Sequence, residues 1–478
     1  MSAAKTRVEM DRRHKIIRFR HLRRATVVSA ALLTGCISAN PAPDLARTAD
    51  LASNRTGLDA NLAQIWSGPW EDRSGGWDGH EALGIDAAVR GALQNDPALR
   101  RHLALVAERR ADLSQASLPP NPIVAMTFGT ALDGMAGAPF AVQAIQQLTW
   151  LWTMSDRIDA ADAVLDGAVF RAAHRVVTTS ATVRVTFARA MCMERLTQLN
   201  ESYVKTTKRT LGKISELHGD GGASQVDLDR ARMDASRASA DYVNALRMYR
   251  SLQLELLRLI GRPEISTDWK MAGNLAATLR YDPPTEEDIE ARATTVRLDL
   301  AAAARFRDAA DAEASLAGWM RFPQVSLATG FRQNFSRRHG WMTGGALSIP
   351  IFDAGSAAIA RAGARIDQAE LSIAELRQAA ITQARLALNE WLRAREQTKL
   401  YGETLVAPAK RVVASLQDAD DSGEAYVTAL LLAQRRMIML ERARVQEMLA
   451  GATAWVKLET AVGGSLQLPL EAPAAPAF

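Results

Sequence analysis

The chain has 478 residues, a length that usually corresponds to two to four domains. Its composition, 48% hydrophobic and 23% charged, is typical of a folded protein and excludes general disorder. The formal net charge of +5 comes from residues 1–24, where nine basic and two acidic side chains give 9 − 2 = +7. Residues 25–35 are uncharged, so the chain from Cys36 onward carries 5 − 7 = −2, which argues against a nucleic-acid-binding protein. No run of eighteen apolar residues is present, and we expect no transmembrane helix.

The N-terminus has the pattern of a secretory signal peptide. The basic segment precedes ATVVSAALL, Ala25–Leu33, an apolar run that is too short to span a membrane. We therefore predict a signal peptide over residues 1–35. The sequence LTGC, which ends at Cys36, resembles the lipobox of bacterial lipoproteins, and this resemblance implies an acylated, palmitate-bearing Cys36 that anchors the chain to a membrane. The alternative is that Cys36 only lies near a cleavage site.

The segment after the signal is expected to be a lipidated linker over residues 36–82. It begins with NPAPDL and contains three tryptophans among glycines, Trp66, Trp70 and Trp77. Export implies an oxidising compartment. Cys192 is the only other cysteine, so no intrachain disulfide is expected, and its helical surroundings predict a small buried residue.

The rest of the chain shows one order of predicted elements twice. Each repeat has a helix, two strands, a very long helix, a short polar turn and a return helix. In the first repeat, 83–262, we expect them at 83–116, 121–131, 140–151, 155–217, 218–222 and 224–260. In the second repeat, 284–463, we expect them at 284–318, 323–333, 341–351, 356–417, 418–423 and 425–461. Residues 263–283 form a linker between the repeats, and 464–478 form a C-terminal tail.

Four landmarks recur in the same order, which indicates an internal duplication. LPPNPIVAMTFG corresponds to RFPQVSLATGF, and LTWLWTMSDR corresponds to LSIPIFDAGS. Gly222 corresponds to Gly423 at an offset of 201 (423 − 222), and LRLIG and LETAVG end at Gly261 and Gly463, an offset of 202 (463 − 261).

The strands show the two-residue alternation of a sheet with unlike faces. In QVSLATGFR, Val325, Leu327 and Phe331 fall on one face, and small or polar residues fall on the other. Each segment is about ten residues long, which suits a tilted strand that crosses a bilayer. Four strands cannot close a barrel, so membrane strands would require several chains to share one. A half-buried strand of a soluble sheet is the alternative.

The long helices have a seam of apolar residues at spacings of three and four, typical of a coiled coil. In the second repeat the seam consists of Ile366, Ala369, Ile373, Leu376, Ala380, Ala384, Leu388 and Trp391. The opening and return helices of each repeat have lengths that suggest stacking end to end beside the long helix. A soluble antiparallel helical bundle is the alternative interpretation.

The transition from strand to helix in LSIPIFDAGSAA has its own chemistry. Pro350 removes a ladder donor and so ends the strand. Asp353 and Gly355 then supply the turn and the helix cap.

Together these features resemble the outer-membrane efflux protein family, the TolC-like channels. The motifs are ALQNDPALR, LPPNPIV, GASQVDL, VRLDLAAA, FPQVSL and LSIPIFDAGSAAIARAGA. The resemblance implies a homotrimer with a transmembrane β-barrel, four strands per chain, continuous with a long periplasmic α-helical barrel. It implies a location in the bacterial outer membrane, with outer-membrane lipid, a periplasmic adaptor and an inner-membrane pump of the RND type as partners. It also suggests that residues 37–80 pack around the outside of the helical barrel; an interfacial role for their tryptophans is the competing view.

The family places a periplasmic aperture at the two helix turns, often with acidic residues after the turn glycine. The candidate gate residues here are Asp227, Asp229, Asp420, Asp421 and Glu424. The second repeat departs from some relatives by carrying Ala429 and Leu432 where they have carboxylates. A carboxylate ring would favour cations; the alternative is that these acids are solvated turn residues and caps. The expected adaptor-docking tips are Gly221, Gly222, Ser224, Gly423 and Ala425.

No catalytic, cofactor or metal motif is present, so we expect neither an enzyme nor a cofactor. The function predicted from the resemblance is a passive conduit that exports small molecules, drugs or metal ions. The alternatives are the outer-membrane conduit of a type I secretion system and a non-porous coiled-coil lipoprotein.

Overall fold

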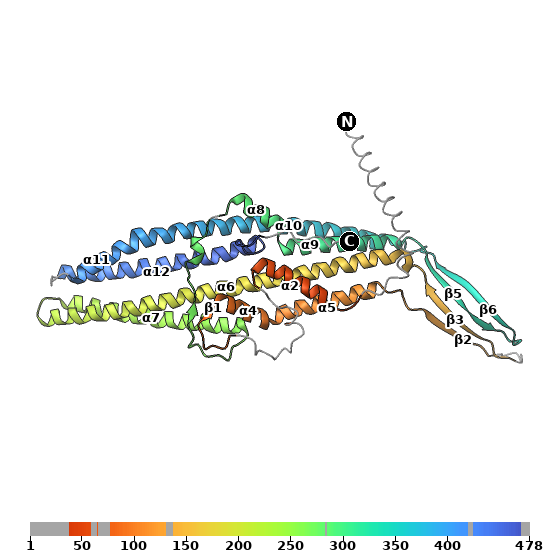
Figure 1. The fold of residues 1–478 in the computed structure, drawn as a ribbon, viewed down its shortest axis with the longest axis horizontal. Coiled ribbons are helices and arrows are strands. Elements are labelled where there is room, and N and C mark those ends of the chain that lie inside the picture. The colour runs from red at the N-terminus through yellow and green to blue at the C-terminus, as the bar shows by residue number, and fades with distance from the viewer. Residues whose placement is uncertain are drawn as a thin grey trace, which may run out of the picture. The chain divides into compact units, whose positions relative to one another are not determined.

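The computed structural model describes residues 38–58, 65, 77–130, 137–282, 284–418 and 424–469, without the side chains of residues 418, 424, 425 and 427. The predicted signal peptide, Cys36, Trp66 and Trp70 lie outside these residues, and the statements about them stay predictions. The described residues fall into two units. Figure 1 shows the order of the elements along the chain.

Unit 1 comprises residues 38–41, 107–166 and 305–370 and contains one antiparallel sheet. Its strands are β2 (Ile123–Phe128), β3 (Phe140–Gln147), β5 (Gln324–Gln333) and β6 (His339–Ser348), in the spatial order β2-β3-β5-β6. The four predicted strands are confirmed. The two strands of the first repeat are shorter than expected, and the two of the second repeat are close to the expected length.

The first strand-to-helix transition comes earlier than the sequence predicts. The amide of Leu148 still donates to the carbonyl of Val325, at 2.8 Å, but α6 (Trp150–Gly219) already begins two residues later. The Thr149 hydroxyl accepts a bond from the Val325 amide at 3.1 Å, which ties the start of the helix to β5. Most of the LTWLWTM motif therefore belongs to the start of α6, and the prediction that the strand continues to residue 151 is wrong.

The second transition has a turn between β6 and α10 (Ser356–Leu400). The amide of Gly355 donates to the carboxylate of Asp353 at 2.9 Å, and Gly355 has a φ of +74°, which favours glycine. A Cβ at Gly355 would lie 2.8 Å from that of Met320. Pro350 lies two residues beyond the end of β6.

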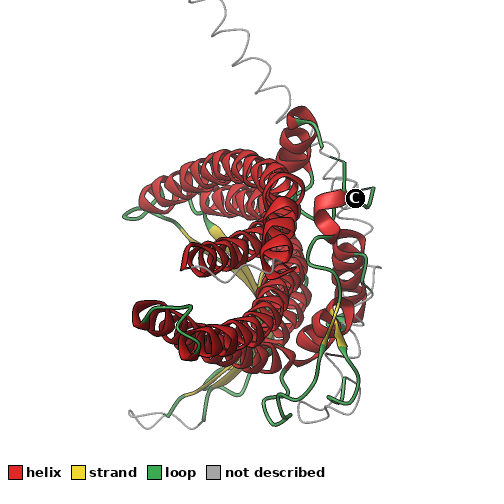
Figure 2. Ribbon diagram, turned by 90° about the vertical axis from the view of Figure 1, so that its left-hand side faces the viewer, coloured by secondary structure: helices red, strands yellow, loops and turns green. Residues whose placement is uncertain are grey.

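Unit 2 comprises residues 42–106, 167–304 and 371–469 of the described chain and is mostly helical. It holds parts of α5 (Pro97–Ala116), α6, α9 (Leu298–Trp319) and α10. Its other helices are α2 (Ala42–Thr56), α4 (Ile85–Asn95), α7 (Gln225–Ile260), α8 (Glu286–Thr295), α11 (Ala407–Asp418) and α12 (Glu424–Ala461). A short 3-10 helix, Ala277–Arg280, precedes α8, and β1 (Leu83–Gly84) pairs in parallel with β4 (Met271–Ala272). Figure 2 shows the long helices end on, lying alongside one another.

The opening helix of each repeat is broken in two, where the sequence analysis expects one helix. In the first repeat Asp96 is extended, with φ −78° and ψ 109°, because it precedes Pro97. Its carboxylate accepts two hydrogen bonds, one from the Ala98 amide at 2.8 Å and one from the Arg175 side chain of α6 at 3.0 Å. In the second repeat the break falls between α8 and α9, where Arg297 directly precedes α9 as Asp96 precedes α5.

Corresponding glycines end the return helices, as the duplication predicts. Gly261 and Gly463 have φ of +77° and +87°, the left-handed geometry of a helix C-cap. The end of α7 meets the opening helix through a hydrogen bond of 2.7 Å, which the side-chain amide of Asn95 donates to the carbonyl of Ile260. The end of α12 is held in the same way by Arg297, which donates to the carbonyl of Ala461 at 3.0 Å. End-to-end contact of the return and opening helices is thus confirmed.

The long helix of the second repeat is interrupted by a π-helical turn, Tyr401–Val406. Pro408 follows it within α11, and a proline lacks the amide donor and clashes with the carbonyl four residues earlier. A wider turn relieves this clash, which explains why the expected helix 356–417 is not uniform.

The core of unit 2 lies along the predicted seam. Ala380, Ala384, Leu388 and Trp391 of α10 are buried, and the Trp391 ring lies 5.1 Å from that of Trp455 on α12. The seam residues nearer the start of α10 are half-buried. Burial raises the pKa of the Cys192 thiol to about 11, so this cysteine is inert and buried, as predicted.

The segment expected to be a linker contains a packed helix. In α2, Leu45, Ala52 and Arg55 are buried, and Arg55 donates to the carbonyl of Val296 at 3.2 Å. The Trp77 ring packs edge-on against that of Trp269, at 5.0 Å. Residues 42–56 of the segment predicted as a linker thus form a packed helix, and its buried side includes the polar Asp44, Thr48 and Arg55.

Candidate functional site

The sheet of unit 1 has two unlike faces, which the strand register separates. One face is mainly apolar and holds Val124, Met126, Phe128, Phe140, Val142, Val325, Leu327, Phe331, Trp341 and Leu347. The other face is mainly small or polar and holds Ala125, Thr127, Ala141, Gln143, Ser326, Ala328, Gly330, Arg332, Gly340, Gly344 and Ala346, together with the larger Ile123, Ile145 and Met342. The division predicted for β5 is thus confirmed, and it extends over all four strands.

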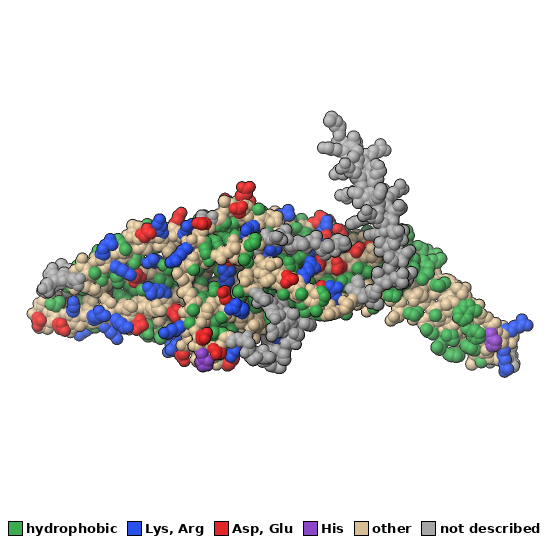
Figure 3. Space-filling model, in the orientation of Figure 1, with side chains coloured by type: hydrophobic (Ala, Val, Ile, Leu, Met, Phe, Trp, Pro, Cys, Tyr) green, Lys and Arg blue, Asp and Glu red, His purple; other side chains and the backbone are tan. Residues whose placement is uncertain are grey.

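The apolar face is exposed in the single chain. Phe128 is 76% exposed and Trp341 is 73% exposed, and every residue of β6 is exposed. Figure 3 shows hydrophobic side chains along this part of the molecule. Within the described chain, β2 and β6 each pair on one side only, so the sheet has two open edges. A large exposed apolar surface of this kind marks contact with a membrane or another protein.

Aromatic side chains gather at both ends of the sheet. Phe128, Phe140, Phe331 and Trp341 lie near the turns that join the strands in pairs. Phe322 and the fully exposed Phe352 lie at the end that joins the helices. A ten-residue strand tilted by about 40° rises roughly 25 Å, the height of the apolar band in a membrane barrel. In a membrane barrel, this spacing would suit the two aromatic girdles.

The first helix turn has a geometry that separates its two candidate acids. The Ser224 hydroxyl and the Asp227 carboxylate form a reciprocal capping box at the start of α7. Asp227 is fully buried, accepting from Ser224 Oγ at 2.6 Å and from Arg230 at 3.4 Å. Asp227 is thus a cap, one of the two roles the sequence left open, and its carboxylate is not a solvent-facing charge in the single chain. Asp229 is exposed, with its carboxylate 3.3 Å from Arg232.

The other tip residues are only partly described. Gly221 and Gly222 are exposed, and Gly221 has a φ of +79°. Val226, next to the tip, is 57% exposed. In the second turn, Asp420, Asp421 and Gly423 lie outside the described residues. Glu424 and Ala425 begin α12, and their side chains are not described.

Two ion pairs that sequence reasoning missed link the two helical hairpins of unit 2, α6–α7 and α11–α12. Arg435 of α12 directs its guanidinium at Asp234 of α7, with Nε 2.9 Å from both carboxylate oxygens. One heptad further along each helix, Arg442 lies 2.9 Å from Asp241 and 3.0 Å from the Asn200 side chain. This set is called the hairpin ladder. The hydrogen bonds that Arg435 donates to the Asp234 carboxylate raise the pKa of this arginine.

A signal for the hairpin ladder was present in the sequence. Asp234 and Arg435 differ by 201 residues, as do Asp241 and Arg442. This is the offset of the two turn glycines, so each pair joins corresponding positions of the two repeats. A search for opposite charges at duplicated positions would have found both pairs.

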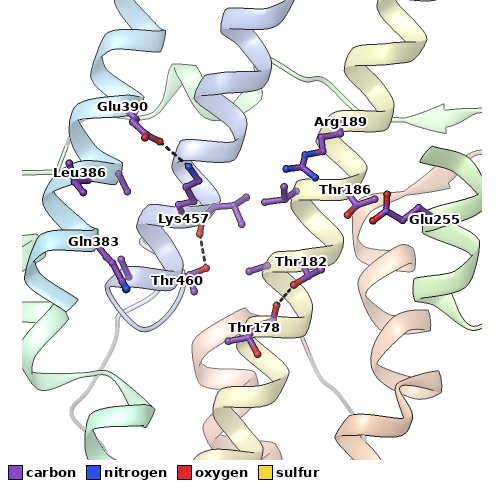
Figure 4. A pocket seen from close by; sticks show the side chains of 15 residues that line it. Thr178, Thr182, Thr186, Arg189, Glu255, Gln383, Leu386, Glu390, Lys457 and Thr460 are labelled. Carbon is purple, nitrogen blue, oxygen red and sulfur yellow. Dashed lines mark hydrogen bonds and ion pairs between the residues drawn. The ribbon is translucent and has the colours of Figure 1, made fainter. Parts of the chain in front are cut away.

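Unit 2 also has a groove of about 620 Å³ between α6, α7, α10 and α12, shown in Figure 4. Its wall includes an ion pair of 3.1 Å between Lys457 and Glu390. Thr178 and Thr182 of α6 donate their hydroxyls to carbonyls of their own helix. The groove thus has a mixed lining, in which these polar groups lie among apolar side chains such as Val185 and Leu386.

In the described parts of the chain, no helix is both long and apolar enough to cross a membrane. The same residues contain no group of three or more histidine, cysteine or acidic side chains placed to hold a metal ion.

Comparison with known proteins identifies the architecture. Residues 291–464 match the family model described as outer membrane efflux protein. The chain is similar to the solved structure of CusC, reported with conformational changes accompanying folding and transmembrane channel formation (17% identity, TM-score 0.69, 80% of this chain and 92% of that one). It is similar to the outer-membrane channel OprN (18% identity, TM-score 0.69, 83% of this chain and 96% of that one). It is also similar to the open state of the MtrE outer membrane channel of Neisseria gonorrhoeae (19% identity, TM-score 0.67, 80% of this chain and 89% of that one).

No curated protein matches the sequence. At identities below 20% the structural similarities establish the fold alone. They cover most of the chain, and the family model covers most of the second repeat. The chain has the TolC-like fold, and its residues 291–464 match the model of the outer membrane efflux protein family.

Proposed function

We propose that the protein is the outer-membrane channel of a tripartite efflux system and passively conducts small molecules from the periplasm to the exterior. The observation that carries this proposal is the sheet of unit 1. Its exposed apolar face suits lipid, and its opposite face of small and polar residues suits a water-filled lumen. Aromatic residues at both ends support the same assignment.

Three chains share one barrel in this proposal. A sheet with open edges is not stable in hydrocarbon, because each unpaired backbone group costs several kcal/mol. Pairing β6 of one chain with β2 of the next removes both edges, and three copies of the four-stranded sheet give twelve strands. The non-porous coiled-coil lipoprotein is disfavoured, since it leaves the exposed apolar face without a role.

A charge on the lipid-facing side of the sheet is expected to prevent assembly. Leu327→Arg places a cation near the middle of the apolar face, at a cost of about 2–4 kcal/mol per chain. Ser326→Arg, the matched control, places it one residue away on the opposite face. The particle mass of detergent-extracted protein should be that of three chains for the wild type and for the control, and not for Leu327→Arg. A monomeric wild-type protein would overturn the shared barrel.

The helix turns are proposed to dock the periplasmic adaptor, through which the channel meets an inner-membrane pump of the RND type. The first turn offers the exposed Gly221 and Gly222 with Val226 beside them. Exposed apolar side chains of this kind are typical anchors of protein interfaces. Gly423 and Ala425 are the corresponding proposal for the second turn.

A photo-crosslinking side chain at Val226 should capture the adaptor in intact cells. Met233, which is 62% exposed two turns further along α7, is the matched control. Adducts identified by mass spectrometry should contain an adaptor with Val226 and lack it with Met233. Equal capture at both positions would show that docking is not confined to the tip.

The hairpin ladder is proposed to hold the two hairpins together near the tips. Arg435→Ala leaves the nearly buried carboxylate of Asp234 without its partner, which costs about 1–3 kcal/mol. Arg436→Ala, the next residue and an exposed one, should change stability by less than about 0.5 kcal/mol. The temperature of unfolding should therefore fall, and single-channel conductance should rise, for Arg435→Ala only. Identical values for the two variants would remove the ladder from the proposal.

Asp229 is the described acid that we propose as an aperture charge, because it is exposed near the turn and Asp227 is not. Asp229→Asn should lower the preference for cations measured from reversal potentials, since a carboxylate ring attracts them. Asp227→Asn, which removes the capping charge, should mainly lower thermal stability. An unchanged cation preference in Asp229→Asn would exclude this residue from the aperture.

A further inference from the structure

Arg332 is the only charged side chain on the small and polar face of the sheet, among the residues that the structure describes. Register places it opposite Gly340 of β6 and Ala141 of β3. Phe331, one residue earlier, faces the other way, because strand residues alternate. The face that carries Arg332 is the one assigned to the lumen above, so this inference rests on the proposed function.

The surroundings of Arg332 leave its guanidinium accessible. The residue is exposed, and its cross-strand neighbours are a glycine and an alanine. A Cβ built at Gly340 would meet nothing within 4 Å. No acidic side chain pairs with Arg332 within the described residues. A permanent charge that has small neighbours and no counter-ion is unusual in a sheet that otherwise carries none.

The same end of the sheet is basic beyond Arg332. Arg337 and Arg338 are exposed in the turn between β5 and β6, and Figure 3 shows basic side chains at this tip. Residues 121–149 and 323–349 contain one acid, Asp133, which lies outside the described residues. These two hairpins therefore carry 3 − 1 = +2 with neutral histidine, or +6 for three chains.

We propose that three copies of Arg332 form a positive ring at the outer mouth of the channel, and that this ring binds and favours anionic cargo. Twelve strands about 4.8 Å apart and tilted by about 40° form a barrel with a backbone radius of roughly 12 Å. Each side chain projects inward from that wall. The Debye length is about 8 Å at physiological salt, so the three charges act across the whole cross-section.

The ligand class follows from the guanidinium. Its planar donors match carboxylate, phosphate and sulfonate groups in a bidentate manner. The barrel end of the channel then favours anions, whereas an aperture lined by Asp229 favours cations. Negatively charged solutes that have passed the aperture are drawn toward the exit.

The test is block of single channels in planar bilayers by tripolyphosphate, added on the side of the strand turns at low salt. Wild-type channels should be blocked, and Arg332→Gln should weaken the apparent affinity by about tenfold, as expected for the loss of a charge-assisted contact. Arg332→Lys keeps the charge and should retain most of the block. Arg338→Gln, which changes a turn residue beyond the barrel wall, should have a smaller effect.

The outcomes separate the inference from the proposed function. If purified wild-type protein forms no channels, the conduit itself is wrong and the ring fails with it. If wild-type channels conduct but tripolyphosphate blocks Arg332→Gln as strongly as the wild type, the conduit stands and the ring is overturned. Block that is lost equally in Arg338→Gln would move the anion site from the lumen to the turn and also overturn it.

Discussion

The backbone hydrogen bonds that β2 and β6 leave unmade on their outer sides are the constraint from which the rest follows. A four-stranded sheet with an exposed apolar face is stable neither in water nor, with open edges, in lipid. In the proposed channel, further copies of the same chain cover both edges. Trimeric assembly is, in this interpretation, a consequence of strand number and not of a dedicated interface.

Duplication explains both the regularity of the helical unit and its exceptions. Asn95 and Arg297 hold the ends of the two return helices at corresponding places, although one is an amide and the other a guanidinium. The ladder residues have diverged further, to an acid in one repeat and an arginine in the other. Two copies with identical charges would repel each other at these positions, whereas opposite charges attract. Divergence thus turned an internal repeat into a contact between its halves.

Charge is distributed unevenly over the functional surfaces. The described strands and the turn between β5 and β6 carry only basic charge, and α7 carries an exposed acid, Asp229, near its start. The groove between α6 and α12 contains an ion pair and hydroxyls that bond to their own helix.

The sequence by itself determined the duplication, the four strands and the long helical seam, because alternation and heptad spacing are properties of neighbouring residues. It also determined which side chains of β5 share a face. The fold class came from the resemblance of its motifs to the outer-membrane efflux protein family. The tertiary structure decided the roles of individual acids. Asp227 and Asp229 are two residues apart and look equivalent in sequence, yet one is a buried cap and the other is exposed. It also decided the partners of Asp234 and Asp241, which lie about two hundred residues away, and the packing of α2. Such contacts depend on how distant helices meet, and no local pattern contains that information.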